Sequence, residues 1–268
     1  METPMDIPDG FDFFDAVLRL ARSKSSNTTE QYAGNVLDVG TNTGIWAVNF
    51  ADLNRNSHVT GIDAVSLHPS NVPENVSFRQ VHNIHGPWEP WELPETFDVI
   101  HCRVLLDKSF NFDCLCQNAF EKLNSGGVLE LEEMQWNIYS DDDTIHPQSP
   151  LLQWVKALEN KLERIPNYTA LEETKAKIES IGFIDVTVEE VKLPINPGVY
   201  PYDPEHIGCW FHSFFAGLLE ASRVPSSWVI PNNKDLALQV REEIRHLSIH
   251  AYFRLYVWTA RKPQENGS

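Results

Sequence analysis

Short apolar runs alternate with amphipathic segments along the first half of the chain. Apolar runs of about 4–8 residues that contain β-branched side chains and end at glycine or polar residues are typical of buried strands. Five segments have this pattern: Asn35–Val39, His58–Ile62, Val76–Val81, Phe97–His101 and Val128–Glu133. Apolar residues recur at helical spacing in Ile45–Leu53 and Phe112–Leu123, and the sequence Asn124-Ser-Gly-Gly127 is a stop signal for the second helix.

The second half of the chain is richer in helical patterns. The spacing predicts helices over Leu151–Arg164, Leu171–Ile181, Glu205–Ser222 and Lys234–His246, and strands over Phe183–Lys192 and His250–Ala260. A proline-rich loop precedes the third of these helices. We therefore predict a helical leader over residues 1–34 and one domain over residues 35–268, with a helical lid inserted at about 194–246, before the last strand.

The order of these segments is that of an α/β protein. Strands that alternate with helices form a mainly parallel sheet that is covered by helices on both faces. Ligands of such sheets bind outside the carboxyl ends of the strands, near the point where the strand order reverses. Functional residues are therefore expected in the loops that follow the strands.

Charge and composition narrow the classes of partner. The 268 residues include 21 Lys and Arg against 38 Asp and Glu, a formal net charge of −17. This acidic balance disfavours nucleic acid and anionic membrane surfaces as partners. The start lacks a signal-peptide pattern, no apolar stretch approaches the ~20 residues that cross a bilayer, and the four cysteines are irregularly spaced. We predict a cytoplasmic protein, with its oligomeric state open.

The segment Val36–Trp46 is the most informative for function. A buried strand runs into a turn with glycines at 40 and 44 and then opens a helix. Glycine permits a sharp turn and a close approach of the backbone, so a ligand can lie against the loop and the helix N-terminus. The segment matches neither the P-loop nor the dinucleotide fingerprint. The carboxylate of Asp38 suits a ligand with a cationic amine better than a pyrophosphate.

A second carboxylate follows about 20 residues later, where Asp63 ends the next strand. In nucleotide-binding α/β folds an acidic residue at this place accepts the ribose hydroxyls. Asp38, Gly40, Gly44 and Asp63 together favour a nucleoside-type cofactor. The alternative is a purely structural turn with solvated carboxylates.

These segments resemble the class I S-adenosylmethionine (SAM)-dependent methyltransferases, and within them the LaeA-like group of fungal secondary-metabolite enzymes. The similarity spans roughly residues 36 to 263 and lies in Val36–Ala51, Phe97–Arg103, Leu123–Glu133, Ser140–Asp142 and Ser248–Pro263. The resemblance implies a Rossmann-like sheet of seven strands whose last strand is antiparallel, with SAM over the first strands.

The same resemblance assigns the cofactor to loops at the strand ends. It places Asp38 near the methionine amine and puts the other contacts on Gly40, Thr41, Gly44, Asp63, Ala64, Asn83, Ile84, Cys102 and Arg103. In this assignment Asp63 holds the ribose and Asn83 lies at the adenine. His101, Cys102 and Arg103 face the methionine end and the substrate.

Three departures from the family pattern keep other functions open. Asn42 replaces a glycine that is usual in the family, and Asn83 replaces an acidic residue. The 34 residues before the first strand are fewer than in the helical leader that such enzymes often have. If position 42 requires a positive φ, asparagine is the least costly replacement for glycine.

Candidate catalytic groups are histidines, because transfer to a hydroxyl needs alignment and a base that works near neutral pH. We select His101 at a strand end and His212 on the aromatic helix. For each, the alternative is a histidine that only makes structural hydrogen bonds. The histidines and aspartates elsewhere have no metal-ligand pattern, so we predict no metal.

Substrate contacts are predicted from an acidic residue at a strand end and from aromatic residues near the lid: Glu133, Trp136, Trp210 and Phe214. Aromatic side chains suit an apolar pocket. The spacing of Trp210, Phe211, Phe214 and Phe215 also fits one apolar helix face in an ordinary core.

Three functions follow from these observations. The first is SAM-dependent methylation of a small, largely apolar natural-product intermediate at O or N. The second is a methyltransferase-fold protein that promotes a cyclisation or rearrangement and does not methylate. The third is a regulatory LaeA-like protein that acts with protein partners.

Overall fold

The computed structural model describes residues 33–64, 66, 68, 70–81, 88, 94, 96–104, 111–162, 171–196, 207–219, 233–246 and 248–265. Almost all of the predicted leader, residues 1–34, lies outside these ranges. So do Asn83 and Ile84, which the resemblance places at the adenine.

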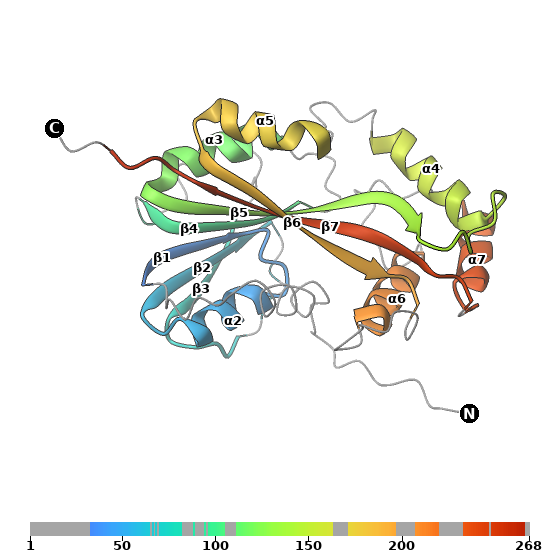
Figure 1. Cartoon of the computed structure of the whole chain (residues 1–268). Coiled ribbons are helices and arrows are strands. Elements are labelled where there is room, and N and C mark those ends of the chain that lie inside the picture. The colour runs from blue at the N-terminus through green and yellow to red at the C-terminus, as the bar shows by residue number, and fades with distance from the viewer. Residues whose placement is uncertain are drawn as a thin grey trace.

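Seven strands form one mixed sheet (Figure 1). They are β1 (Gly34–Val39), β2 (Ser57–Asp63), β3 (Val76–Gln80), β4 (Phe97–Val104), β5 (Leu123–Ser140), β6 (Ile184–Pro194) and β7 (Ala251–Arg261). Their order in the sheet is β3-β2-β1-β4-β5-β7-β6, and β7 runs antiparallel to both of its neighbours. The predicted α/β class, the seven strands and the antiparallel last strand are confirmed.

Helices cover both faces of this sheet (Figure 1). They are α2 (Ile45–Leu53), α3 (Phe112–Lys122), α4 (Pro150–Leu162), α5 (Leu171–Ile181), α6 (Ile207–Leu218) and α7 (Lys234–Glu243). In the view of Figure 1, α3 and α5 lie on one side of the strands and α2 on the other, whereas α4, α6 and α7 gather at the far ends of β5, β6 and β7. None of the helices in the described ranges is long and apolar enough to cross a membrane.

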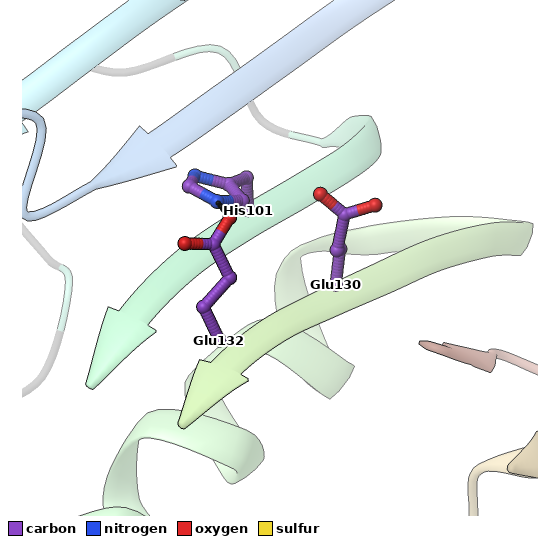
Figure 2. Close-up of side chains that lie close together, drawn as sticks. All are labelled: His101, Glu130 and Glu132. Atoms are coloured by element: carbon purple, nitrogen blue, oxygen red, sulfur yellow. Dashed lines mark hydrogen bonds and ion pairs between the residues drawn. The ribbon is translucent and has the colours of Figure 1, made fainter. Parts of the chain in front are cut away.

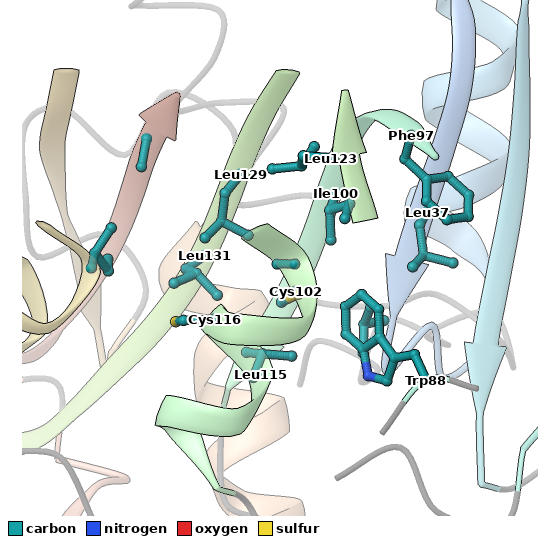
Figure 3. Close-up of a cluster of buried hydrophobic side chains, with 14 of the residues drawn as sticks. Leu37, Trp88, Phe97, Ile100, Cys102, Leu115, Cys116, Leu123, Leu129 and Leu131 are labelled. Carbon is teal, nitrogen blue, oxygen red and sulfur yellow. The ribbon is translucent and has the colours of Figure 1, made fainter. Parts of the chain in front are cut away.

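Two buried clusters fill the two faces of the parallel part of the sheet. Helix α3 packs on strands β1, β4 and β5 through apolar residues, among them Leu37, Ile100, Leu115 and Leu131 (Figure 3). On the opposite face, Trp46 and Phe50 of α2 pack against β1 and β2. Because successive side chains of a strand point to opposite faces, β1, β2 and β4 each supply residues to both clusters.

A third buried cluster lies in the region of the predicted lid. Phe211 and Phe215 of α6, Trp154 of α4 and Phe253 of β7 are all fully buried in it. Helices α6 and α7 therefore pack on the extended halves of β5, β6 and β7. Ordinary core packing, one of the two interpretations of this aromatic helix face, accounts for Phe211 and Phe215.

Strand β5 differs most from its prediction over Val128–Glu133. It begins at Leu123, directly after α3, because the stretch predicted to stop the helix pairs with its neighbours: Gly126 N donates to Lys262 O and Lys262 N donates to Gly127 O, both at 2.9 Å. Helix α3 does end before this stretch, at Lys122, and strand β5 continues beyond its predicted end to Ser140 through pairing with β7.

Candidate functional site

The loop between β1 and α2 has an unusual backbone. Gly40, Asn42 and Gly44 have φ angles of 74°, 51° and 78°. The amides of Gly40 and Thr41 both donate to Ile62 O, at 2.9 and 3.0 Å, and Gly44 N donates to Thr41 O at 2.8 Å. Position 42 thus does adopt the positive φ that asparagine tolerates, and the loop is fixed against the end of β2.

Gly44 is required for a second reason, which is close packing. A Cβ atom at this position would lie 2.3 Å from Cζ of Phe78 in β3. The helix that follows has no side-chain cap and no acidic residue in its first turn among the described residues. Its first N–H groups and its positive dipole end therefore face the loop, an arrangement that favours a ligand with electron-rich groups.

Asp63 holds this loop from the end of β2. Its Oδ2 accepts a hydrogen bond from Asn42 N at 2.9 Å, and its side chain is half-buried. The next residue, Ala64, is exposed and its carbonyl accepts from Gln80 Nε2 at 2.9 Å. The structure therefore places Asp63 and Ala64 beside the loop, where the sequence predicts a ribose site.

A buried network of charged side chains lies beneath the loop. His101 of β4 is fully buried, with Nδ1 at 2.7 Å from Asp38 Oδ1 and Nε2 at 2.7 Å from Glu132 Oε1. The second oxygen of Asp38 accepts from Thr41 Oγ1 at 2.6 Å. The second oxygen of Glu132 accepts from Arg103 Nε at 3.0 Å. The network thus runs from the loop residue Thr41 to Arg103 at the end of β4.

Strand register explains why these residues meet. Asp38 pairs with His101 across β1 and β4, and His101 and Arg103 pair with Glu130 and Glu132 across β4 and β5. All five point to the face of the sheet that α2 covers, and Figure 2 shows His101 together with the two glutamates of β5. The ring of Trp46 in α2 stacks on His101, with centroids 3.9 Å apart and planes at 6°.

The carboxylates determine the charge of His101. Burial alone lowers the pKa of its imidazole, but the charges and hydrogen bonds of Glu132 and Asp38 outweigh this effect and raise the pKa to about 9. A pKa in this range favours the imidazolium form at neutral pH, in which both ring nitrogens donate. A histidine in this state is not a free base, so its hydrogen bonds match the structural alternative.

His101, Glu130 and Glu132 are close enough to be considered as cation ligands, since their donor atoms lie within 4.8 Å of one another. The 2.7 Å separation of His101 Nε2 and Glu132 Oε1 is a hydrogen-bond distance. We interpret the group as a hydrogen-bonded network.

Two of the predicted site residues point to the other face of the sheet. Cys102 is buried in the cluster under α3, where burial raises the pKa of its thiol well above the usual value. Glu133 accepts hydrogen bonds from Thr174 Oγ1 at 3.0 Å and from Trp258 Nε1 at 3.2 Å. The structure does not bring either side chain to Asp38 and His101.

The remaining candidates belong to the region of the predicted lid. His212 of α6 donates from Nδ1 to Ile195 O at 2.8 Å. Trp136 is buried and lies edge-on to Phe253, at a centroid distance of 5.7 Å. The side chains of Trp210 and Phe214 lie outside the described residues, so their contact with a substrate stays a prediction.

Trp46 was not among the site residues predicted from the sequence. Glu133 was predicted as a site residue, but the network contains the neighbouring Glu132. The alternation of faces along a strand was the available signal for the glutamate. Asp38, His101 and Arg103 share one face, and the register of β4 and β5 selects Glu132 for that face. The register itself could not be derived from the chain alone.

Fungal proteins are among those with a similar sequence. This chain is 32% identical over 240 residues to "Secondary metabolism regulator LAE1" of Cochliobolus heterostrophus, which covers 86% of this chain and 77% of that protein. It is 26% identical over 264 residues to "Protein-methionine methyltransferase laeA" of Emericella nidulans, which covers 95% of this chain and 70% of that protein.

Solved structures are similar in fold. Phosphoethanolamine N-methyltransferase 2 of Haemonchus contortus, crystallised with SAM, superposes with a TM-score of 0.51 at 15% sequence identity. The match covers 94% of this chain and 53% of that chain, so this chain spans about half of the enzyme's length.

The methyltransferase-domain family matches residues 12–187, which is more than half of the chain. This match agrees with the strand order, with the loop after β1 and with the fungal relatives. The chain therefore belongs to the methyltransferase-domain family.

Proposed function

We propose that this chain transfers the methyl group of SAM to O or N of a small, largely apolar natural-product intermediate. The observation that carries the proposal is the loop after β1, in which three residues with positive φ lead into an uncapped helix beside the carboxylate of Asp63. Loops of this shape let a nucleoside ligand approach the backbone closely.

The residues around the loop fit SAM. Thr43 Oγ1 is buried and, within the described part of the chain, has no hydrogen-bond partner, so it can bond to a ligand. Gly40, Thr41 and Gly44 would hold the methionine part, and Asp63 with Ala64 would hold the ribose. When bound, SAM supplies an electrophilic methyl group on a sulfonium.

The protonation state of His101 affects which atom of a substrate can accept the methyl group. Both ring nitrogens are hydrogen-bonded to carboxylates, so His101 has no lone pair with which to accept a proton. An amine attacks with its own lone pair and loses its proton afterwards. Methylation of a nitrogen therefore needs no base among these residues during the attack, whereas methylation of a hydroxyl oxygen does.

A second candidate is methylation of a protein within a regulatory role. The names of the fungal relatives favour it, since one is called a secondary metabolism regulator and another a protein-methionine methyltransferase. A thioether sulfur carries a lone pair and no proton, so it too needs no base. The chemistry of the buried network is compatible with either acceptor.

Isotope transfer separates these candidates. The purified chain is incubated with SAM labelled on its methyl group, together with either a low-molecular-weight fungal extract or methionine-containing proteins. Label in organic-extractable products, with an equal amount of S-adenosylhomocysteine, supports the first proposal. Label in acid-precipitated protein supports the second. Turnover of a small molecule without S-adenosylhomocysteine would indicate the cyclisation alternative.

The variant Asp63→Asn tests the cofactor site itself. Its amide carbonyl can still accept from Asn42 N, so the loop is retained while the negative charge is lost. We expect SAM to bind about tenfold more weakly in calorimetry, because a hydrogen bond to a charged group is weakened. A folded wild-type chain that binds no SAM would contradict the proposed function.

A further inference from the structure

We propose that His101 is a positioning residue: held as an imidazolium between Asp38 and Glu132, it fixes the carboxylate that supports the SAM loop, and it thereby sets the affinity of the chain for SAM. This inference rests on the proposed role of the loop as the SAM site. Neither the family match nor the names of the relatives assigns a role to this residue.

The geometry gives His101 a direct connection to the loop. Asp38 is 1% exposed, and its two oxygens are bonded to His101 Nδ1 and to Thr41 Oγ1 at 2.7 and 2.6 Å. The carboxylate that was expected at the methionine amine is thus engaged inside the protein. Its role in this arrangement is to hold Thr41, and with it the turn between Gly40 and Gly44, in place.

The hydrogen-bonding pattern requires a proton on each ring nitrogen. Each nitrogen faces an oxygen of a carboxylate at 2.7 Å, and the other oxygen of each carboxylate already accepts from Thr41 or Arg103. A neutral imidazole would direct a lone pair at one of these carboxylates. The stacked ring of Trp46 adds a cation–π contact that also favours the cation.

Groups from four elements face the imidazole. They are Asp38 of β1, Arg103 of β4, Glu130 and Glu132 of β5, and Trp46 of α2. The imidazolium and the guanidinium balance the two carboxylates that they contact. Loss of the His101 proton leaves Asp38 and Glu132 with one cation between them, and it removes one of the two short hydrogen bonds. We expect the support of Thr41 to weaken as a result.

The test compares the wild type with His101→Gln, whose side chain donates hydrogen bonds but does not titrate in this range. The affinity for S-adenosylhomocysteine is measured by calorimetry at intervals from pH 7 to pH 10. We expect the variant to bind about tenfold more weakly at pH 7, as for the loss of a charge-assisted hydrogen bond. The wild-type affinity should fall as the pH rises through about 9.

The ligand's own amino group titrates in this range as well, but that contribution is common to both proteins. The difference between the two profiles therefore isolates His101. Nitrogen-15 NMR of the wild type gives an independent measurement, and we expect both ring nitrogens of His101 to be protonated at pH 7.

His58→Gln is the matched control, because His58 is an exposed histidine of β2. It should retain both the wild-type affinity and the wild-type pH profile. If His101→Gln does not fold, the double variant His101→Gln/Glu132→Gln removes one negative charge as well and restores the charge balance for the same comparison.

Two results would overturn the proposal. One is a His101→Gln protein that binds S-adenosylhomocysteine with the wild-type affinity and pH profile. The other is an NMR spectrum of the wild type that shows a neutral His101 at pH 7. A wild-type chain that does not bind S-adenosylhomocysteine at all would instead remove the proposed function on which the inference rests.

Discussion

Asn42 occupies a left-handed conformation, with φ at 51°, in the middle of the loop between β1 and α2. Side chains with a Cβ atom are strained in this region, and asparagine tolerates it better than other residues because its side chain can bond locally. Asparagine at position 42, where the resemblance leads us to expect glycine, therefore preserves the backbone conformation of the loop.

Substitutions at this position should separate conformation from chemistry. Asn42→Ala is expected to lower the free energy of unfolding by about 1 kcal/mol and to weaken SAM binding, because alanine is strained at this φ. Asn42→Gly should stay within about 1 kcal/mol of the wild type and retain binding. Urea denaturation and calorimetry measure the two quantities, and an alanine variant as stable as the glycine variant would contradict this account.

Two pairs of neighbouring residues also show how the alternation of side chains along a strand places them on opposite faces of the sheet. Arg103 and Cys102 are neighbours in sequence, yet one joins the charged network under α2 and the other is buried under α3. Glu132 and Glu133 divide in the same way. Residue type alone could not choose between them, since both glutamates are chemically suited to the site.

Among the helices and strands, β5 differs most from its predicted range. The sequence after Glu133 continues an alternating pattern, with Met134, Trp136 and Ile138 on one face. That pattern is typical of a strand, but its pairing partner, β7, is more than 100 residues away in the chain. The extension creates the surface on which α4, α6 and α7 pack.

Removing a large side chain from this surface should be costly. Phe253 of β7 is fully buried and its ring lies 5.3 to 5.7 Å from the rings of Phe215, Phe211 and Trp136. Phe253→Ala is expected to lower the free energy of unfolding by about 3–5 kcal/mol, through lost burial and the cavity that remains.

Leu238→Ala is the control for this prediction, since Leu238 of α7 is 61% exposed. A change within about 0.5 kcal/mol is expected there. Chemical denaturation followed by tryptophan fluorescence measures both variants. Equal effects of the two substitutions would show that the third cluster does not stabilise the chain.

At the scale of the whole molecule, the buried network links strands β1, β4 and β5 and the loop between β1 and α2 through the imidazole of His101. The pKa of His101 is about 9 in the folded chain and about 6.5 in an unfolded one. Its contribution to stability is therefore complete below the unfolded value and is lost as the pH rises through about 9.

This linkage predicts how the free energy of unfolding decreases at alkaline pH. Between pH 7 and pH 10 the wild type should lose up to about 3 kcal/mol of unfolding free energy that His101→Gln does not lose. Urea denaturation of both proteins at several pH values measures the difference, and lysines and tyrosines that also titrate there affect both alike. Parallel profiles of the two proteins would contradict the assignment.

The sequence by itself determined the α/β class, the approximate strands, the turn at Gly40 and Gly44 and the carboxylates at the ends of β1 and β2. These features are local, because they follow from periodicity, from the freedom of glycine and from the place of a polar residue after an apolar run.

The tertiary structure alone decided that Asp38, His101, Glu132 and Arg103 form one network, and that Cys102 and Glu133 lie on the opposite face. The physical reason is register. A slip of one residue between two strands moves every side chain to the other face, and register is set by packing between segments that are distant in the chain.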